Sequence, residues 1–296
     1  MSRPQIMFGR GAVVVGGSSG VGFAVASLLA MNGAGVVING RDGAAVDRAV
    51  AEIRAAGGAA WGVEGSAADS LVADKLVGTC VAECDAVDVL VNCAGIAEPS
   101  GSSILSVDPR DWQAQLDSHL ATTFTTCRIA APRMVAQQRG SIINTSSFAF
   151  LGDFGGTGYA AAKGAVNSLT LAIAAELKDK AVRANVVCPG ARTRLSTGSA
   201  YEDHLTELYR RGMIDQVTMD ASLDPPPADY AAAVYLYLSS ASAVSVTGEI
   251  FVAAGGFVGR YRRQTPQVLG YRDHRTSPVW PIGDLHRMIA TDMDAT

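Results

Sequence analysis

Residues 12–32 read AVVVGGSSGVGFAVASLLAMN: a short run of valines, a cluster of glycines and then a stretch with helical periodicity. The consecutive valines predict a strand that is buried on both faces, as the strands of a parallel sheet are. Glycine permits a tight turn and a close approach of the backbone to a ligand, and the N-terminus of the next helix favours negative charge. The order of strand, glycine turn and helix therefore predicts a site for the pyrophosphate of a dinucleotide.

Short β-branched runs and longer helical stretches continue to alternate along most of the chain. We expect strands at residues 12–16, 36–39, 60–63, 87–92, 141–146, 182–188 and 249–253. We expect helices at residues 21–32, 44–56, 71–83, 109–138, 159–178 and 228–238. The expected fold class is therefore α/β, with a single Rossmann-type, doubly wound parallel sheet of about seven strands flanked by helices.

The chain is expected to form one dinucleotide-binding catalytic domain, residues 1–258, because no linker-like boundary precedes residue 190. Within this domain, residues 191–229 have no strand signal, contain one expected short helix at 201–211 and end in a run of three prolines. A long excursion of this kind is usually a functional lid or a disordered segment, and we interpret it as a lid over the substrate. Residues 259–296 form a C-terminal extension, which either packs on a neighbouring subunit or hangs free.

The composition argues against several classes of protein. Of the 296 residues 48% are hydrophobic and 18% are charged, so a large core is expected. The net charge of -4 argues against nucleic-acid binding, and no apolar run approaches the roughly 18 residues that span a bilayer. The N-terminus shows no secretory signal, and the spacing of the five cysteines fits no zinc motif. We expect a reduced, cytoplasmic protein without a metal site.

Tyr159 and Lys163 are spaced i, i+4 at the start of an expected helix, so they share one face. A phenol has a pKa of about 10 and is a poor acid–base catalyst at neutral pH unless a cation lowers that pKa. Lys163 is placed to do this. The pair follows the strand that ends in Asn144-Thr145-Ser146-Ser147, which supplies hydroxyl groups nearby.

These motifs, in this order, resemble those of the short-chain dehydrogenase/reductase family. The glycine turn, residues 16–22, has the spacing G-x-x-x-G-x-G, and residues 92–95 (Asn-Cys-Ala-Gly) look like the family's N-N-A-G stretch. Cys188-Pro189-Gly190, followed by Thr193, resembles the P-G stretch and downstream Thr of the family. The resemblance covers the chain from about Gly11 to about Phe257. Within the family, the chain has some likeness to the branch of 3-hydroxyacyl-CoA dehydrogenases and 3-oxoacyl reductases.

The resemblance implies reversible hydride transfer between a nicotinamide dinucleotide and a carbonyl carbon. It implies that Tyr159 exchanges the proton, that Lys163 lowers the pKa of the phenol and holds the nicotinamide ribose, and that a serine orients the oxygen. The expected cofactor-binding residues are Gly16, Gly17, Ser18, Ser19, Gly20, Val21, Gly22, Asn39, Gly40, Arg41, Asn92, Ala94, Gly95, Tyr159, Lys163, Pro189, Gly190 and Thr193.

Two serines compete for the catalytic position. In the family the serine usually lies 13 residues before the tyrosine, which selects Ser146. Counting along the strand from Gly140 selects Ser147 instead, because the following segment is one residue short. Strand register determines side-chain direction more firmly than loop length does, so Ser147 is preferred and Ser146 is the alternative.

A histidine stands where the family usually has an asparagine. That asparagine lies seven residues after a tryptophan and helps to hold a water in a proton relay to the lysine; counting from Trp112 gives His119. Histidine also has hydrogen-bonding ring nitrogens, so it can serve the same relay. In having a histidine at this position, the chain resembles the 3-hydroxyacyl-CoA dehydrogenase domain of peroxisomal multifunctional proteins. The alternative is a structural histidine between packed helices.

The choice of cofactor depends on the end of the second expected strand. An acidic residue there binds the ribose hydroxyls of NAD, whereas an arginine suits the 2′-phosphate of NADP. Alignment with the family puts Gly40 at the usual acidic position and Arg41 next to it, which favours NADP. In the rival interpretation Asp42 binds the ribose of NAD while Arg41 stacks on the adenine.

The leading hypothesis is an NADP-dependent oxidoreductase that acts on a lipophilic small molecule: a 3-oxoacyl thioester, a steroid or another ketone. Phe148, Phe150 and Phe154 near the catalytic strand favour an apolar pocket. The alternatives are an NAD-dependent 3-hydroxyacyl-CoA dehydrogenase and a catalytically inactive nucleotide-sensing protein. The resemblance also implies a homodimer or homotetramer.

Overall fold

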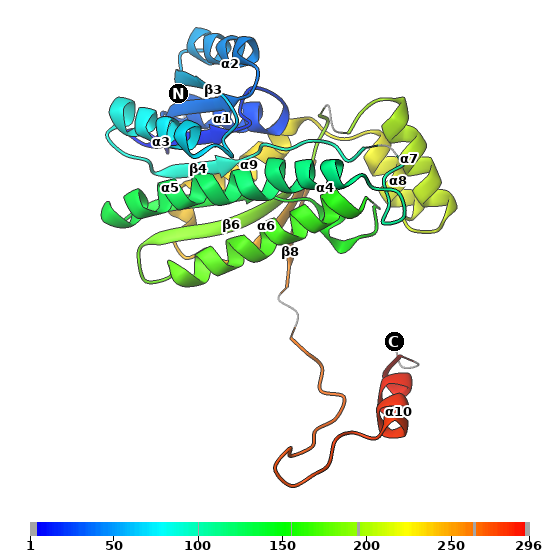
Figure 1. The fold of residues 1–296 in the computed structure, drawn as a ribbon. Helices are drawn as coiled ribbons and strands as arrows, with labels where there is room; N and C mark the ends of the chain where they lie inside the picture. The colour runs from blue at the N-terminus through cyan, green and yellow to red at the C-terminus, as the bar shows by residue number, and fades with distance from the viewer. Residues whose placement is uncertain (1–4, 100, 155, 194–195, 263–264, 294–296) are drawn as a thin grey trace. The chain divides into compact units, whose positions relative to one another are not determined.

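The structure is a computed structural model, which describes residues 5–99, 101–154, 156–193, 196–262 and 265–293. The described chain forms one eight-stranded sheet in the order β3-β2-β1-β4-β5-β6-β7-β8 (Figure 1). The strands are β1 (Gly11–Val15), β2 (Gly35–Gly40), β3 (Ala59–Glu64), β4 (Val89–Asn92), β5 (Gly140–Thr145), β6 (Val182–Gly190), β7 (Ile250–Ala254) and β8 (Phe257–Tyr261). The first seven are parallel, which confirms the predicted Rossmann-type sheet.

Helices cover both faces of the sheet. The helices of the described chain are α1 (Gly20–Met31), α2 (Gly43–Ala55), α3 (Ser70–Cys84), α4 (Pro109–Gln115), α5 (Thr122–Ala136), α6 (Thr157–Glu176), α7 (Ser199–Arg210), α8 (Gln216–Leu223), α9 (Ala228–Ser239) and, after the last strand, α10 (Ile282–Met293). Short turns of other helix types are the π-helix η1 (Leu116–Ala121) and the 3₁₀ helices η2 (Phe148–Leu151) and η3 (Ala241–Ala243).

Alternate residues of one strand enter different cores, which is why β1 reads as an unbroken run of valines. Val14 packs with side chains of α1 and α9, whereas Val13 and Val15 pack with side chains of α3 and α5 on the other face. All residues of β1 are buried. A strand between two helical layers has no solvent-facing side, so its side chains are apolar at every position.

The long helix expected at 109–138 is not continuous. It is divided into α4, the π-helix η1 and α5. The hydroxyl of Thr122 donates to the carbonyl of Asp117, and that of Thr123 donates to the carbonyl of His119 (3.0 and 2.7 Å). π-Helices occur mostly as single turns inside α-helices, often at functional sites, and no local pattern in this sequence indicates one here. The turn places His119 in the interior.

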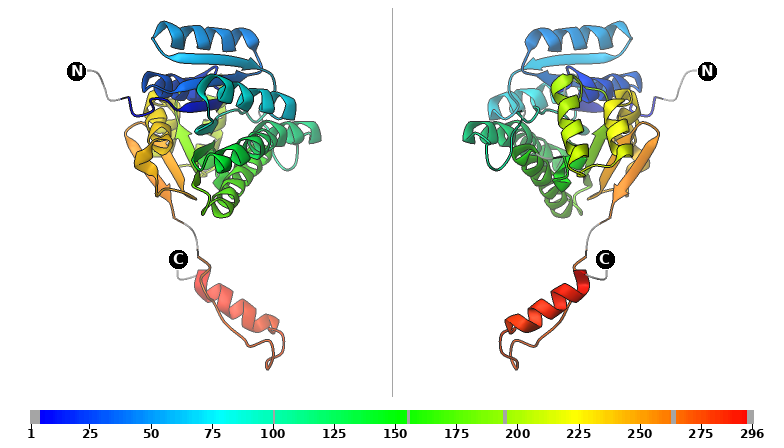
Figure 2. Two further views of the ribbon diagram at one scale, coloured as in Figure 1. Left: turned by 90° about the vertical axis from the view of Figure 1, so that its left-hand side faces the viewer. Right: turned by 90° about the vertical axis from the view of Figure 1, so that its right-hand side faces the viewer.

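Two further departures concern the C-terminal part of the chain. The segment 191–229 holds two helices, α7 and α8, where the sequence predicts one; its residues 194 and 195 lie outside the described residues. The eighth strand was not expected: β8 pairs antiparallel with β7 and lies at the edge of the sheet, in orange in Figure 2. Gly255-Gly256 joins these two strands, and a two-residue glycine loop is a strong hairpin signal.

The chain divides into two compact units, residues 1–261 and 262–296. The first unit includes the whole of β8, whereas the boundary expected at residue 258 falls inside this strand. In the second unit, Arg272 pairs with Asp284 (2.7 Å) and stacks over the ring of Trp280 at 4.2 Å. In the described residues no helix is long and apolar enough to cross a membrane.

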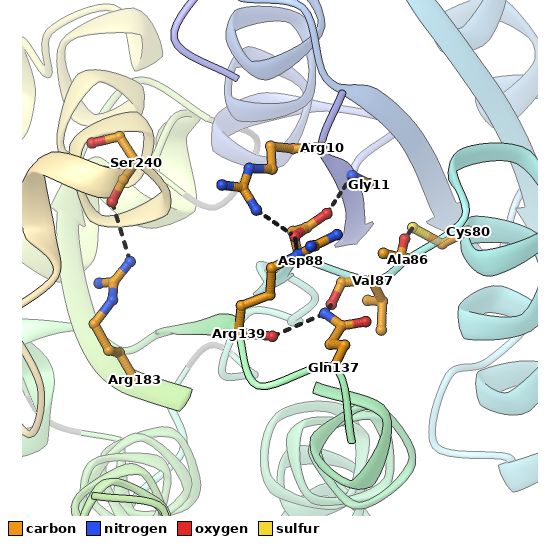
Figure 3. A network of polar contacts seen from close by, with 10 residues as sticks. All are labelled: Arg10, Gly11, Cys80, Ala86, Val87, Asp88, Gln137, Arg139, Arg183 and Ser240. Atoms are coloured by element: carbon orange, nitrogen blue, oxygen red, sulfur yellow. Dashed lines mark hydrogen bonds and ion pairs between the residues drawn. The ribbon is translucent and has the colours of Figure 1, made fainter. Parts of the chain in front are cut away.

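A buried carboxylate connects three strands at the edge of the sheet where they begin (Figure 3). Asp88 directly precedes β4, and its Oδ1 accepts from Arg10 Nη1 (2.9 Å) and Arg139 Nε (2.5 Å). Its Oδ2 accepts from the backbone N–H of Gly11, the first residue of β1 (3.0 Å). Arg139 precedes β5, so one side chain holds the starts of β1, β4 and β5 together.

Candidate active site

One large cavity, of about 1970 Å³, opens where β1, β2, β4, β5 and β6 end. The strand order reverses between β1 and β4, and in open α/β sheets ligands bind at this switch point, beyond the carboxyl ends of the strands. Pockets for drug-sized ligands measure roughly 300–1,000 Å³, so this cavity has room for a dinucleotide and a second molecule.

The glycine turn between β1 and α1 can be built only from glycine at key positions. Gly16 and Gly20 have φ angles of +73° and +56°, a region that other residues rarely adopt. A Cβ on residue 16 would lie 2.6 Å from the amide nitrogen of Ala94, and one on residue 22 would lie 2.2 Å from the carbonyl oxygen of Gly16. The backbone of this turn, with Ser18, Ser19 and Val21, lines the cavity. The missing Cβ atoms let the turn pack closely on residue 94 and on itself, so its backbone lines the cavity at the N-terminus of α1, where a pyrophosphate fits.

Gly17, unlike the other glycines of this turn, faces the sheet. It does not line the cavity; a Cβ there would lie 2.9 Å from both Ile38 Cγ2 and the carbonyl oxygen of Val14. It therefore allows the turn to pack closely on β1 and β2, rather than facing a ligand.

The end of β2 presents an arginine to the cavity and no acidic side chain. Gly40 and Arg41 line the cavity, whereas Asp42 does not. The carboxylate of Asp42 instead caps α2, since its Oδ1 accepts from the N–H of Ala45 (3.1 Å). Asn39 is buried, and its amide donates to the carbonyls of Val63 (2.9 Å) and of the neighbouring residue 65 (3.0 Å), which joins β2 to β3.

The Asn-Cys-Ala-Gly segment splits between the cavity and the core. Ala94 and Gly95 line the cavity, but Asn92 does not. Its amide is buried, donating to Asn144 Oδ1 (2.9 Å) and accepting from the hydroxyl of Thr126 (2.8 Å). Asn92 therefore joins β4 to β5 and α5.

The end of β6 and the following Thr193 lie on the side of the cavity next to the glycine turn. Pro189, Gly190 and Thr193 line the cavity. A Cβ on Gly20 would lie 3.4 Å from Thr193 Cγ2, so this threonine faces the glycine turn.

Ser147, Tyr159 and Lys163 all line the cavity. The hydroxyl of Ser147 accepts from the N–H of Ala149 (3.2 Å) and lies near enough to Tyr159 to act on the pKa of its phenol. Lys163 Nζ lies 5.5 Å from the centroid of the Tyr159 ring and donates to the carbonyl oxygen of Thr145 (3.0 Å). Ser146 is buried, and its hydroxyl donates to the backbone carbonyl of Lys163 (3.1 Å). Of the two serines, Ser147 faces the phenol.

Burial has the largest effect on the pKa values of Tyr159 and Lys163. Desolvation raises the pKa of Tyr159 to about 12, although the hydrogen bond from Ser147 acts in the opposite direction. Desolvation also lowers the pKa of Lys163 to about 8. In the protein alone, burial determines the pKa of the phenol, and the lowering that the sequence assigns to Lys163 is not seen. Tyr159 is therefore a protonated phenol at neutral pH, which suits a proton donor.

His119 is buried against the tyrosine. Its ring lies edge-on to that of Tyr159 with centroids 5.1 Å apart, and its Nε2 lies 3.1 Å from the carbonyl oxygen of Ile96. Desolvation lowers the pKa of His119 to about 2, so the ring is neutral. Its Nδ1 is buried and has no hydrogen-bond partner in the described structure. Gly95 leaves the space for this ring, because a Cβ there would lie 2.4 Å from His119 Cε1.

Several residues of the cavity were not identified from the sequence. Glu98 accepts hydrogen bonds at the N-terminus of α6, and Tyr201 and Tyr261 enter the cavity from α7 and β8. The expected lid with its helix at 201–211 includes Tyr201, and the glycine pair before β8 could have indicated Tyr261, but Glu98 has no local signal. The described residues contain no cluster of three or more histidine, cysteine or acidic side chains that would hold a metal ion.

Comparison with known proteins agrees with this geometry. Residues 10–202 match the family model of the short chain dehydrogenases. A 3-oxoacyl-[acyl-carrier-protein] reductase of Synechocystis sp. is 32% identical over 249 residues, which are 83% of this chain and 96% of that protein. A 3alpha-hydroxysteroid dehydrogenase of Mediterraneibacter gnavus is 35% identical over 247 residues, 82% of this chain and 95% of that protein.

Solved structures show the same relationship. A short chain dehydrogenase from Mycobacterium avium has a TM-score of 0.78 and 30% identity, with 97% of this chain and 95% of that chain covered. A 3-oxoacyl-[acyl-carrier protein] reductase from Brucella melitensis has a TM-score of 0.73 and 29% identity, with 86% and 93% covered. The chain therefore belongs to the short-chain dehydrogenase family and is an NAD(P)-dependent oxidoreductase that acts on CH–OH or C=O groups.

Proposed function

We propose that the protein transfers a hydride between NADP(H) and a carbonyl or secondary alcohol of a lipophilic small molecule, with Ser147, Tyr159 and Lys163 as catalytic residues. The observation that carries this proposal is the meeting of these three side chains in the cavity that the glycine turn also lines. The bound nicotinamide cofactor supplies or accepts the hydride.

The protein residues move the proton and stabilise the oxygen. In the reducing direction Tyr159 gives its hydroxyl proton to the carbonyl oxygen, and Ser147 donates a hydrogen bond that orients this oxygen. Once the proton has left, the nearby Lys163 ammonium stabilises the phenolate. In the oxidising direction the same groups act in reverse order. After reduction the phenolate regains a proton from Lys163, and the unpartnered Nδ1 of His119 suits a water that brings a proton from solvent to this amine.

The preference for NADP rests on the charges at the end of β2. Arg41 lines the cavity there, and its guanidinium matches the 2′-phosphate. The position that is usually acidic is Gly40, and the carboxylate of Asp42 is engaged in capping α2. The hydroxyl of Ser18 lies beside Gly40 and supplies a further donor.

A lipophilic substrate is supported by the side chains around Tyr159. Phe148, Phe154, Tyr201, Val217 and Phe257 line the cavity, while Phe150 does not. Tyr201 and Val217 lie on α7 and α8, which supports the role of residues 191–229 as a lid over the substrate. The names of the relatives, a 3-oxoacyl-[acyl-carrier-protein] reductase and a 3alpha-hydroxysteroid dehydrogenase, support 3-oxoacyl thioesters and steroids as candidate classes.

A second candidate is an NAD-dependent 3-hydroxyacyl-CoA dehydrogenase. His119, at the position where the family usually has asparagine, favours it. A panel of ketones, 3-oxoacyl thioesters and the corresponding alcohols, each measured with NADPH and NADH, separates the two candidates.

We further infer a cytoplasmic homodimer or homotetramer. The five cysteines are free thiols, which suits a reducing compartment. Phe124 on α5 is 53% exposed beside an apolar hollow formed with Leu116, Leu120 and Leu169. An exposed apolar patch of this kind suits a contact between subunits.

Tyr159→Phe tests the proposal directly. Because the phenylalanine keeps the ring and loses the proton, we expect turnover to fall by about 10²–10⁴-fold while the Kd for NADPH stays within about twofold. The control is Tyr230→Phe, which changes an exposed tyrosine on α9 and should leave both quantities unchanged. Retained turnover in Tyr159→Phe would overturn the catalytic assignment.

A further inference from the structure

Glu98 brings a carboxylate to the N-terminus of α6, 60 residues further along the chain. Its Oε1 accepts from the N–H of Gly158 (3.4 Å) and its Oε2 accepts from the N–H of Tyr159. The hydroxyl of Ser102 donates to Oε1 (2.7 Å) and steadies the carboxylate. The first N–H groups of a helix have no partner within the helix, and the helix dipole favours negative charge there.

The local sequence of α6 makes this distant cap necessary. Four other helices, α2, α3, α4 and α8, are capped by the aspartate that directly precedes them. At α6 the N-cap is Gly156, which has no side chain and a φ of +75°. A Cβ on Gly156 would lie 2.9 Å from Glu98 Cγ, so the glycine both leaves the cap to another residue and makes room for it.

The segment that carries Glu98 is also held from its other side. The carbonyl of Ile96 lies 3.1 Å from His119 Nε2, and the carbonyl of Ala97 accepts from Gln115 Nε2 (2.7 Å). Residues 96–98 therefore bridge the α4–η1 region and the first turn of α6. All three line the cavity, so a wall of the cavity is joined directly to the backbone of Tyr159.

We propose that Glu98 is a positioning residue, whose carboxylate sets the place of Tyr159 relative to Ser147 by joining the 96–98 wall of the cavity to the first turn of α6. This inference rests on the proposed function, in which Tyr159 exchanges the proton. The backbone N–H of Tyr159 is the third in α6, so loss of the cap releases the turn that carries the phenol. A misplacement of about 1 Å in a reacting group can cost about 10²-fold in rate.

The test compares Glu98→Gln and Glu98→Ala with the wild type. Glu98→Gln keeps the shape but loses the charge, and we expect kcat to fall about tenfold, with a fall of about 10²-fold in Glu98→Ala. The Kd for NADPH should stay within about twofold, because Glu98 faces Tyr159 rather than the glycine turn. The solvent deuterium isotope effect on kcat should rise, since proton transfer from a displaced phenol becomes slower. Hydrogen exchange of residues 156–162 should become faster.

Asp108→Asn is the matched control. Asp108 lies in the same connection between β4 and α4 and caps α4 by accepting from the N–H of Arg110 (2.7 Å), but it does not line the cavity. This variant should change neither kcat nor the isotope effect.

The outcomes separate this inference from the proposed function. If the wild type transfers no hydride in the substrate panel, the proposed function fails, and hydrogen exchange in Glu98→Gln still tests the cap on its own. If Glu98→Gln keeps the wild-type kcat and isotope effect, the positioning role is overturned. It is also overturned if kcat falls only in proportion to a loss of folded protein, with the isotope effect unchanged.

Discussion

Gly40 determines which charge the end of β2 can present. A Cβ at this position would lie 2.8 Å from Ser18 Oγ and 3.0 Å from Val46 Cγ2, so a larger residue must displace its neighbours. The acidic side chain that would bind the ribose of NAD therefore has no room here without rearrangement. The next residue, Arg41, is exposed and lines the cavity.

Arg41→Ala should weaken the binding of NADPH selectively. A hydrogen bond to a charged group contributes about 1.5–3 kcal/mol, so the Kd for NADPH should rise about 10- to 150-fold. The Kd for NADH, which has no 2′-phosphate, should change by about twofold or less. Fluorescence titration with both cofactors measures the two constants, and Arg48→Ala, an exposed arginine on α2, is the control. Tighter binding of NADH than of NADPH by the wild type would instead support the NAD-dependent alternative.

The choice between two neighbouring serines shows what a residue-level pattern can and cannot settle. Ser147 is favoured over Ser146 because strand register alternates the two side chains, and in the structure Ser147 acts on the phenol of Tyr159 while Ser146 donates to the backbone carbonyl of Lys163. The role of Asn92 cannot be predicted from the sequence. An asparagine after a strand looks the same in sequence whether its amide faces a ligand or, as here, bonds Asn144 in the core.

At the scale of elements, Asp88 joins the starts of three strands on the side of the sheet away from the cavity (Figure 3). Its carboxylate is 5% exposed, whereas its partners Arg10 and Arg139 are 42% and 50% exposed. Removing the carboxylate therefore leaves no buried cation, but the N–H of Gly11 loses its charged partner.

Asp88→Asn should lower the free energy of unfolding by about 1.5–3 kcal/mol, the contribution of hydrogen bonds to a charged group. Thermal or urea unfolding measures the change. The matched control is Asp74→Asn, which breaks the exposed pair between Asp74 and Arg133 and should cost about 0–1 kcal/mol. Equal effects of the two substitutions would contradict the structural role of Asp88.

Helix boundaries were predicted well where a local signal exists. Aspartates precede α2, α3 and α4 and cap them, within a residue or two of the expected starts. The π-helix η1 and the capping of α6 by Glu98 have no such signal, since no residue pattern marks the π turn and the cap is a contact across 60 residues.

At the scale of the whole molecule, the first unit contains everything that builds the site. The eight strands of the described sheet and the described hydrophobic clusters all lie within residues 1–261. The second unit has its own contacts, among them the pair between Arg272 and Asp284.

A chain that ends at Tyr261 should therefore fold and bind NADPH with a Kd within about twofold of the wild type. Circular dichroism, thermal unfolding and cofactor titration check this. A chain that ends at Gly256 is the comparison: it removes β8, exposes the edge of β7 and should unfold at a lower temperature. Failure of the longer chain to fold would show that residues 262–296 are part of the catalytic unit.

The sequence by itself determined the class of fold, the position of the glycine turn and the Tyr159–Lys163 pair. Each of these depends on neighbours within a few residues: apolar runs, glycine conformations and the i, i+4 spacing of a helix. The tertiary structure alone decided that Glu98 caps α6, that Asn92 and Gly17 face the core, and that His119 packs on Tyr159. The physical reason is that these contacts join segments whose separation along the chain carries no periodic signal, and only the folded sheet with its packed helices brings them together.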